Sequence, residues 1–227
     1  MGAHILGQFD PEFTALMNQT MEMERYVFQT QNKMTYLVDT TSRGGLETVL
    51  TGAICPGDKV LIPAFGRFGY LLAEILERCG ADITLLEREW GTVFEPEEIE
   101  EALKKDSYKA VAFIHGETST SMMQPLKEIG EICEKYGALL IVDTVANMGG
   151  GDIPVDKWGI DGCIAGTQKC ISAPSGSALI TYNEQIEEIV KKRKKVEKGI
   201  RTADDVNGSL AGIPSNYLDL AQLEDYW

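Results

Sequence analysis

Two oppositely charged side chains follow short apolar runs of the sequence, at positions from which they can act together on a ligand. Asp143 directly follows the run 139–142, and Lys169 comes shortly after the run 163–165. Nearly unbroken apolar runs are typical of strands buried on both faces of a parallel sheet, whose carboxyl ends meet at one edge. An amine and a carboxylate at that edge predict a nucleophile and a partner for a protonated nitrogen.

The sequence also predicts an anion site at the start of a helix. Thr41, Ser42 and Arg43 precede a helical apolar pattern, and the first N–H groups of a helix are free to bind a negative group. With Asp143 and Lys169 on the same edge, this combination suits pyridoxal 5'-phosphate above other cofactors. Lys169 would attach the cofactor, Asp143 would pair with its pyridine nitrogen, and the helix start would hold its phosphate.

Each of these residues also has a simpler explanation when it is taken alone. A strand-end aspartate is often a turn cap, and a single lysine is usually a surface residue. The segment 41–45 matches neither a dinucleotide-binding motif nor a Walker loop. Thr118 is explained equally well as a loop cap, and Phe68 as the first core residue of an apolar helix stripe. The combination of residues favours a cofactor site, rather than any one of them.

The elements that must carry these residues alternate between two periods. Six short apolar runs predict strands, and helical apolar stripes between them end at glycines, as after Cys79 and Tyr136. This alternation predicts an α/β fold of three layers, in which a mostly parallel sheet carries helices on both faces. The predicted strands are 60–62, 83–86, 110–114, 139–142, 163–165 and 178–181.

We expect one cofactor-binding large domain, over residues 36–198, between two less regular ends. Residues 1–35 contain a methionine-rich helical stretch and are interpreted as an N-terminal arm. Residues 199–227 are interpreted as an irregular C-terminal segment. Both ends have the character of arms that pack on a partner chain. The basic run 191–195 is flanked by glutamates, which favours a solvated helix face.

Composition disfavours several classes of function. The 227 residues carry a net charge of −14, which argues against binding to nucleic acid or to an anionic membrane. Only two histidines are present, and we predict no metal site. The five cysteines form no CxxC motif, which favours a reduced, cytoplasmic location. No apolar run approaches the roughly 18 residues of a membrane span, and no secretory signal is recognised.

Most of the chain resembles the fold-type I, class V aminotransferases, in particular the alanine–glyoxylate and (S)-ureidoglycine–glyoxylate aminotransferase group. VDTV and GTQK form a highly specific pair within this resemblance. GRFGY, EWGTVF and the ending QLEDYW favour the ureidoglycine branch over the alanine branch. The segments that carry the resemblance are TSRGGLE (41–47), GRFGY (66–70), EWGTVF (89–94), HGETST (115–120), VDTVANMGG (142–150), GTQKCISAPSG (166–176) and SNYLDLAQLEDYW (215–227).

The resemblance implies a role for each matching position. Lys169 matches the lysine that forms the Schiff base, Gln168 its neighbour that contacts the cofactor, and Asp143 the partner of the pyridinium nitrogen. Val145 is expected on one face of the ring, and Phe68 is expected to stack on it. The remaining positions are Thr118 near the phenolic oxygen, and Thr41, Ser42 and Arg43 in the phosphate-binding turn.

The implied reaction is transamination from a small amino donor to an oxo acid, glyoxylate, with ureidoglycine as the first donor and alanine or serine as the alternatives. The resemblance also implies a homodimer and a part in purine catabolism. The family's small C-terminal domain, with its substrate-binding arginine, finds no match here, so a large-domain fragment with little activity of its own is another interpretation. A lyase or desulfurase is the third, with Cys170 as its candidate cysteine.

Overall fold

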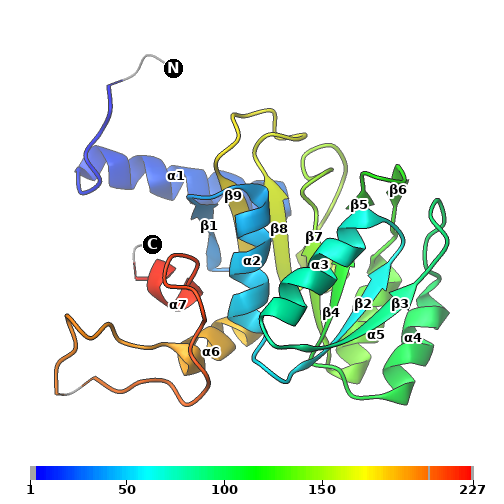
Figure 1. Cartoon of the computed structure of the whole chain (residues 1–227). Helices are drawn as coiled ribbons and strands as arrows, with labels where there is room; N and C mark the ends of the chain where they lie inside the picture. Colours follow the sequence, from blue (N-terminus) through cyan, green and yellow to red (C-terminus); the bar gives the residue numbers. More distant parts are fainter. Residues whose placement is uncertain (1–3, 204, 226–227) are drawn as a thin grey trace.

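A seven-stranded sheet forms the centre of the protein in the computed structural model (Figure 1). The structure describes residues 4–203 and 205–225, so the ends of the predicted arm and of the predicted C-terminal segment, Trp227 included, lie outside the described residues. The strand order is β1-β9-β8-β7-β4-β2-β3. These strands are β1 (Met34–Val38), β2 (Lys59–Ala64), β3 (Asp82–Glu87), β4 (Ala110–Ile114), β7 (Leu139–Asp143), β8 (Gly162–Gly166) and β9 (Ala178–Tyr182).

The parallel part of the sheet consists of β8, β7, β4, β2 and β3, whose carboxyl ends share one edge. β9 and β1 continue the sheet as antiparallel strands. Every residue of β4, β7, β8 and β9 is buried, as the unbroken apolar runs predict. The predicted mostly parallel α/β fold is confirmed, and each of its predicted strands is present. β1 is an additional strand, which begins within the segment predicted as an arm.

Helices cover both faces of the sheet. The chain passes outward from β2 to β3 through α3 (Arg67–Arg78) and returns to β4 through α4 (Pro96–Lys105). Right-handed crossovers therefore put α3 and α4 on opposite faces. α2 (Ser42–Ala53) packs beside α3, and α5 (Lys127–Tyr136) packs beside α4. The resulting layers can be followed in Figure 1 and confirm the predicted architecture.

The remaining helices belong mostly to the two ends of the chain. α1 (Pro11–Phe28) contacts β1 and β9, and α6 (Glu184–Arg193) contacts α2. The short α7 (Leu220–Leu223) also contacts α2, and a 3-10 turn, η1 (Asp156–Trp158), contacts α5. Among the described residues, no helix combines the length and the apolar character needed to cross a lipid bilayer.

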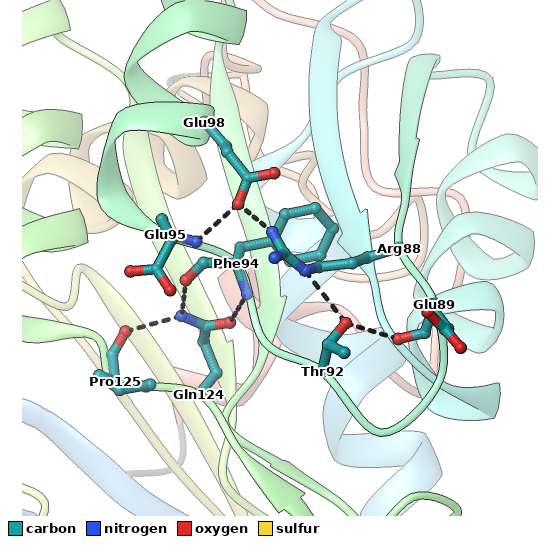
Figure 2. Close-up of polar contacts among 8 residues, drawn as sticks. All are labelled: Arg88, Glu89, Thr92, Phe94, Glu95, Glu98, Gln124 and Pro125. Atoms are coloured by element: carbon teal, nitrogen blue, oxygen red, sulfur yellow. Dashed lines mark hydrogen bonds and ion pairs between the residues drawn. The ribbon is translucent and has the colours of Figure 1, made fainter.

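The loop between β3 and α4 is held by polar contacts, of which those of Gln124 with Phe94 are buried (Figure 2). The fully buried side chain of Gln124 accepts a hydrogen bond from the N–H of Phe94 and donates one to its carbonyl oxygen. α4 starts with a capping box, in which Glu98 accepts from the N–H of Glu95. Arg88 pairs with Glu98 and lies 5.6 Å from the centroid of the Phe94 ring. These contacts hold the loop in one conformation, because they tie it to the segment between β4 and α5 and to the start of α4 at the same time.

The basic run 191–195 departs from its predicted solvated position at one residue. The two lysines before Arg193 are exposed, whereas Arg193 is 1% exposed. Its guanidinium group donates to the carbonyl oxygens of Thr51 and Ile54 at the end of α2, and its Nε donates to that of Ala211. The predicted solvated face is therefore wrong at Arg193. Carbonyl groups at the end of a helix lack intrahelical donors, and a guanidinium group can satisfy several of them at once.

Candidate active site

A cavity of about 250 Å³ at the carboxyl edge of the sheet collects every residue that the sequence predicts to hold the cofactor. They come from the start of α2, the first turn of α3, the segment after β5 (Gly116–Glu117), and the ends of β7 and β8. β5 pairs with β6 (Met122–Met123) in a small antiparallel ladder just beyond β4. The predicted residues in the lining are Thr41, Ser42, Arg43, Phe68, Thr118, Asp143, Val145, Gln168 and Lys169.

Asp143 is the last residue of β7 and is 7% exposed. Its Oδ1 accepts a hydrogen bond from the N–H of Val145 at 2.8 Å. Its Oδ2 has no hydrogen-bond partner within the described residues. The pKa of Asp143 is raised to about 7: burial is the largest cause, the hydrogen bond from the Val145 N–H lowers it, and the negative charge of Glu117 adds to the rise. The site therefore holds a buried carboxyl group with one oxygen available to a ligand.

Lys169 follows β8 and lines the same cavity, where its side chain is exposed. Within the described residues it has no ion pair, so its amine is available for chemistry. The neighbouring Gln168 accepts a hydrogen bond from the hydroxyl of Ser42 at 3.0 Å, which joins the loop after β8 to the start of α2. A Cβ at Gly166 would lie 2.2 Å from the Ser42 Oγ, so this close approach requires glycine.

The start of α2 forms one side of the cavity. Thr41 is its N-cap residue, and its Oγ1 accepts from the N–H of Gly44. The N–H groups of Ser42 and Arg43 stand in the first helical turn, where no acceptor is available within the helix and the helix dipole is positive. The exposed Arg43 side chain lines the same cavity. Backbone donors and a guanidinium group in this position suit a phosphate.

Apolar side chains form the rest of the lining. Phe68 is half-buried in the first turn of α3, and Leu71 follows it one helical turn later. Val145 lies just after Asp143 and is also half-buried. A planar ring can pack against such side chains while its polar atoms reach the groups described above.

Glu117 does not line the cavity but bonds to the helix turn that carries Phe68, and the sequence patterns did not single it out. Its side chain is 1% exposed and accepts a hydrogen bond from the N–H of Phe68 at 2.9 Å. One sequence signal pointed to it indirectly. Gly66, the N-cap residue of α3, has no side chain to cap the helix, so the cap had to come from another part of the chain.

Cys170 does not line the cavity that contains Lys169, although the two residues are neighbours in the sequence. Its thiol lies 3.3 Å from the carbonyl oxygen of Ala146 and belongs to a separate cavity of about 470 Å³, which His115 and Trp158 also line. The lyase or desulfurase alternative requires a cysteine at the reacting groups, and none of the described residues that line the Lys169 cavity is a cysteine.

Comparison with known proteins decides the family. The family profile Aminotransferase class-V matches residues 4–216. The chain belongs to the class-V aminotransferases. Among relatives of this class-V chain, the (S)-ureidoglycine–glyoxylate transaminase of Bacillus subtilis (strain 168) is 56% identical over 230 residues. The alanine–glyoxylate aminotransferase of Oryctolagus cuniculus is 35% identical over 193 residues. The crystal structure of the ureidoglycine–glyoxylate aminotransferase from Bacillus subtilis matches with a TM-score of 0.91 at 53% identity.

These matches cover the class-V chain almost completely but the relatives only in part. The Bacillus relative is matched over 100% of this chain and 55% of its own length, and the Oryctolagus relative over 85% and 49%. The solved structure is matched over 100% of this chain and 54% of its own. The chain therefore spans about half the length of the curated relatives it matches. The resemblance inferred from the motifs is confirmed at the level of family and fold.

Class-V aminotransferases depend on pyridoxal 5'-phosphate, and the residues of the cavity fit this cofactor. Asp143 offers a buried carboxylate oxygen without a partner, which suits a pyridine N–H. Lys169 offers a free amine, which suits an aldehyde. The first turn of α2 offers N–H groups and Arg43, which suit a phosphate.

Proposed function

We propose that the protein is a pyridoxal-phosphate-dependent transaminase that moves an amino group from a small donor, ureidoglycine first, to glyoxylate. The observation that carries this proposal is the shared cavity of Asp143 and Lys169 beside the open start of α2. The 56% identity to a ureidoglycine–glyoxylate transaminase supports the donor and the acceptor. Alanine or serine is the alternative donor, which the similarity to alanine–glyoxylate aminotransferases supports.

We assign the cofactor contacts residue by residue. Lys169 is the attachment point for the aldehyde, and Gln168 contacts the cofactor beside it. The Asp143 carboxyl group pairs with the pyridine nitrogen, and Phe68 and Val145 pack on the ring. Thr118 lies near the phenolic oxygen. The phosphate is held by Thr41, Ser42 and Arg43. Support comes from the common cavity and from the free donor and acceptor atoms around it.

In this proposal the bound cofactor supplies an electron sink next to the donor's Cα. The Nζ of Lys169 takes the proton from that carbon as general base and later returns a proton as general acid. The buried Asp143 keeps the proton on the partner nitrogen, because a hydrogen bond to a carboxylate is strong in a site of low dielectric. Phe68 and Val145 exclude water from the ring faces.

One observation favours the alternative that these 227 residues bind the cofactor with little turnover. Among the described residues that line the cavity, Arg43 is the one guanidinium group, and we assign it to the phosphate. A substrate carboxylate is held best by a bidentate arginine. If no second arginine reaches the cavity, donor binding and orientation are weak.

We further propose a homodimer in the cytoplasm and a part in purine catabolism. The exposed apolar side chains of α1, such as Leu16 and Met23, support an interface on that helix. A ureidoglycine donor supports the assignment to purine breakdown.

Two measurements test the proposed function. The protein mixed with pyridoxal phosphate and treated with borohydride should carry the label on the peptide that contains Lys169, and Lys169→Ala should abolish labelling. Lys127→Ala is the matched control, because Lys127 is exposed and lines the neighbouring cavity instead. Donor screening with glyoxylate should then rank ureidoglycine above alanine and serine. Label on another lysine overturns the site, and a different ranking overturns the donor.

A further inference from the structure

Glu117 is a buried carboxylate that the proposed reaction does not use. It is 1% exposed and ends the short strand β5. Its Oε2 accepts a hydrogen bond from the N–H of Phe68 at 2.9 Å. Its Oε1 accepts two, from the N–H of Ser119 at 2.9 Å and from the hydroxyl of Ser119 at 2.7 Å. All three contacts are donations to the carboxylate, which an acceptor-only group accommodates well.

These contacts cap the first turn of α3. The hydroxyl of Ser119 also accepts a hydrogen bond from the N–H of Arg67 at 2.9 Å. The N–H groups of Arg67 and Phe68 are among those that a helix cannot satisfy itself. Gly66 precedes them without a side chain, so Glu117 and Ser119 provide the cap from a distant part of the chain.

The carboxylate also packs tightly against the residue before the helix. A Cβ at Gly66 would lie 2.3 Å from Cγ and 2.4 Å from Cδ of Glu117. Its φ of 179° is extended backbone, so glycine is needed here for space and not for conformation. The position of the first turn of α3 is therefore coupled to the position of Glu117.

The first turn of α3 reaches the cavity through Phe68. Glu117 stands between Gly116 and Thr118, which line the same cavity as Asp143, so its negative charge lies near that carboxyl group. That charge raises the pKa of Asp143, after the larger effect of burial. Other charged or titratable residues near Asp143 are Cys163 with its buried thiol, the cavity-lining Lys169 and Arg43, and His115, whose backbone N–H donates to the Asp143 carbonyl oxygen at 2.9 Å. Glu117 is the one carboxylate of this set.

We infer that Glu117 is a positioning residue of the site. It holds Phe68 toward the cofactor ring, and its negative charge opposes loss of the proton that lies between the Asp143 carboxylate and the ring nitrogen. The inference rests on the proposed function for the identity of the ring. Its two parts separate experimentally, because the first depends on the shape of the acceptor and the second on its charge.

The capping part is tested without cofactor by amide hydrogen exchange. Glu117→Gln keeps the size of the side chain but replaces one acceptor oxygen with a donor. We expect the amides of Arg67 and Phe68 to exchange about tenfold faster or more, the effect of one lost hydrogen bond to a carboxylate. Glu87→Gln is the matched control, since Glu87 is exposed and accepts from the hydroxyl of Tyr70 on the same helix. Equal exchange in Glu117→Gln and wild type overturns the capping role.

The charge part is tested by titration of Asp143 in the cofactor-free protein. The infrared band of its protonated carboxyl group is assigned with Asp143→Asn. Glu117→Gln should lower the titration midpoint, whereas Glu117→Asp, which keeps the charge, should leave it close to wild type. A merely structural role predicts that both variants behave alike, and that result overturns the inference.

Cofactor binding separates this inference from the proposed function. Wild type that fails to take up pyridoxal phosphate at Lys169 overturns the proposed function. Wild type that binds it while Glu117→Gln binds equally well, with the same visible absorbance, overturns the role of Glu117 alone. We expect binding about tenfold weaker in Glu117→Gln. If Glu117→Gln does not fold, Ser119→Ala is the alternative variant, because it retains the negative charge of Glu117. It should speed amide exchange chiefly at Arg67 and leave the titration midpoint of Asp143 unchanged.

Discussion

The two ends of α2 both carry backbone groups that the helix itself cannot pair, but among the described residues a side chain from a distant segment pairs them at one end only. At its start, the N–H groups of Ser42 and Arg43 stand at the cavity without an acceptor in the helix. At its end, the buried Arg193 donates to the carbonyl oxygens of Thr51 and Ile54. The open end has groups available for a ligand, and the closed end fixes the scaffold. Unpaired polar groups cost stability, so they persist where a ligand can compensate for them.

The same contrast extends to the charged side chains. Asp143 keeps one carboxylate oxygen unpaired at the cavity, and Lys169 has no ion pair among the described residues. Arg193 instead uses its donors on backbone carbonyl oxygens of two separate segments. Substitutions in the open set should therefore change chemistry more than stability, and substitutions in the closed set should do the reverse.

The largest effect is expected for Lys169→Ala. Loss of the attachment point and general base should slow exchange of the donor's α-proton by about 1,000-fold or more. Thermal stability should stay within about 0.5 kcal/mol of wild type, because the side chain is exposed. Exchange measured by NMR and unfolding measured by calorimetry check both parts. Exchange at the rate of Lys127→Ala would remove Lys169 from the reaction.

Arg193→Leu should have the opposite profile. Several buried carbonyl oxygens would lose their donor, which should cost about 3 kcal/mol or more. For a chain of this size the thermal midpoint should fall by roughly 6–12 °C. Lys192→Met, at an exposed neighbouring position, is the control and should change little. The contrast between the two ends of α2 breaks down if Arg193→Leu unfolds at the wild-type temperature.

Asp143→Asn tests whether the buried carboxyl group acts on chemistry or only as a turn cap. The asparagine can still accept from the Val145 N–H, so the fold should persist. Loss of a charge-assisted hydrogen bond of about 1.5–3 kcal/mol should slow α-proton exchange about ten- to a hundredfold. A lower thermal midpoint with an unchanged exchange rate per folded molecule would favour the capping role instead.

The smallest effect concerns Glu24, a buried acid of α1 outside the cavity. Neither of its carboxyl oxygens has a hydrogen-bond partner in the part of the chain that the structure describes, and burial raises its pKa to about 8. Because the folded pKa is the higher one, the protonated acid favours the folded state, and this stability is lost as pH rises from about 4.5 through about 8. Glu24→Gln should therefore raise the thermal midpoint at pH 8.5 by roughly 2–4 °C, corresponding to about 1 kcal/mol, with little change at low pH.

The control for this prediction is Glu22→Gln, at a position of the same helix that is exposed and paired with Arg25. It should show no such pH dependence. Stabilisation of Glu24→Gln that is equal at pH 4 and at pH 8.5 would exclude titration of Glu24 as its cause.

Much of the fold and of the candidate site could be predicted from local patterns. The buried strands β4 and β7 appear as unbroken apolar runs, so the sequence pattern alone places Asp143 at a carboxyl edge. The start of α2 is recognisable from Thr41 and the apolar stripe after it. Residues that follow directly from such elements, Lys169 among them, lie in one cavity, as predicted.

Local patterns define which groups stand at that edge, because strand and helix periods depend on neighbouring residues alone. Packing of the elements determines which polar groups meet across long separations. Arg193 is buried because the end of α2 needs donors, and Glu117 caps α3 because Gly66 cannot. Packing also places Cys170 at a different cavity from the one that Lys169 lines. These long-range hydrogen bonds depend on which backbone groups remain unpaired once the elements have packed. The helix and strand patterns of the sequence contain no information about that.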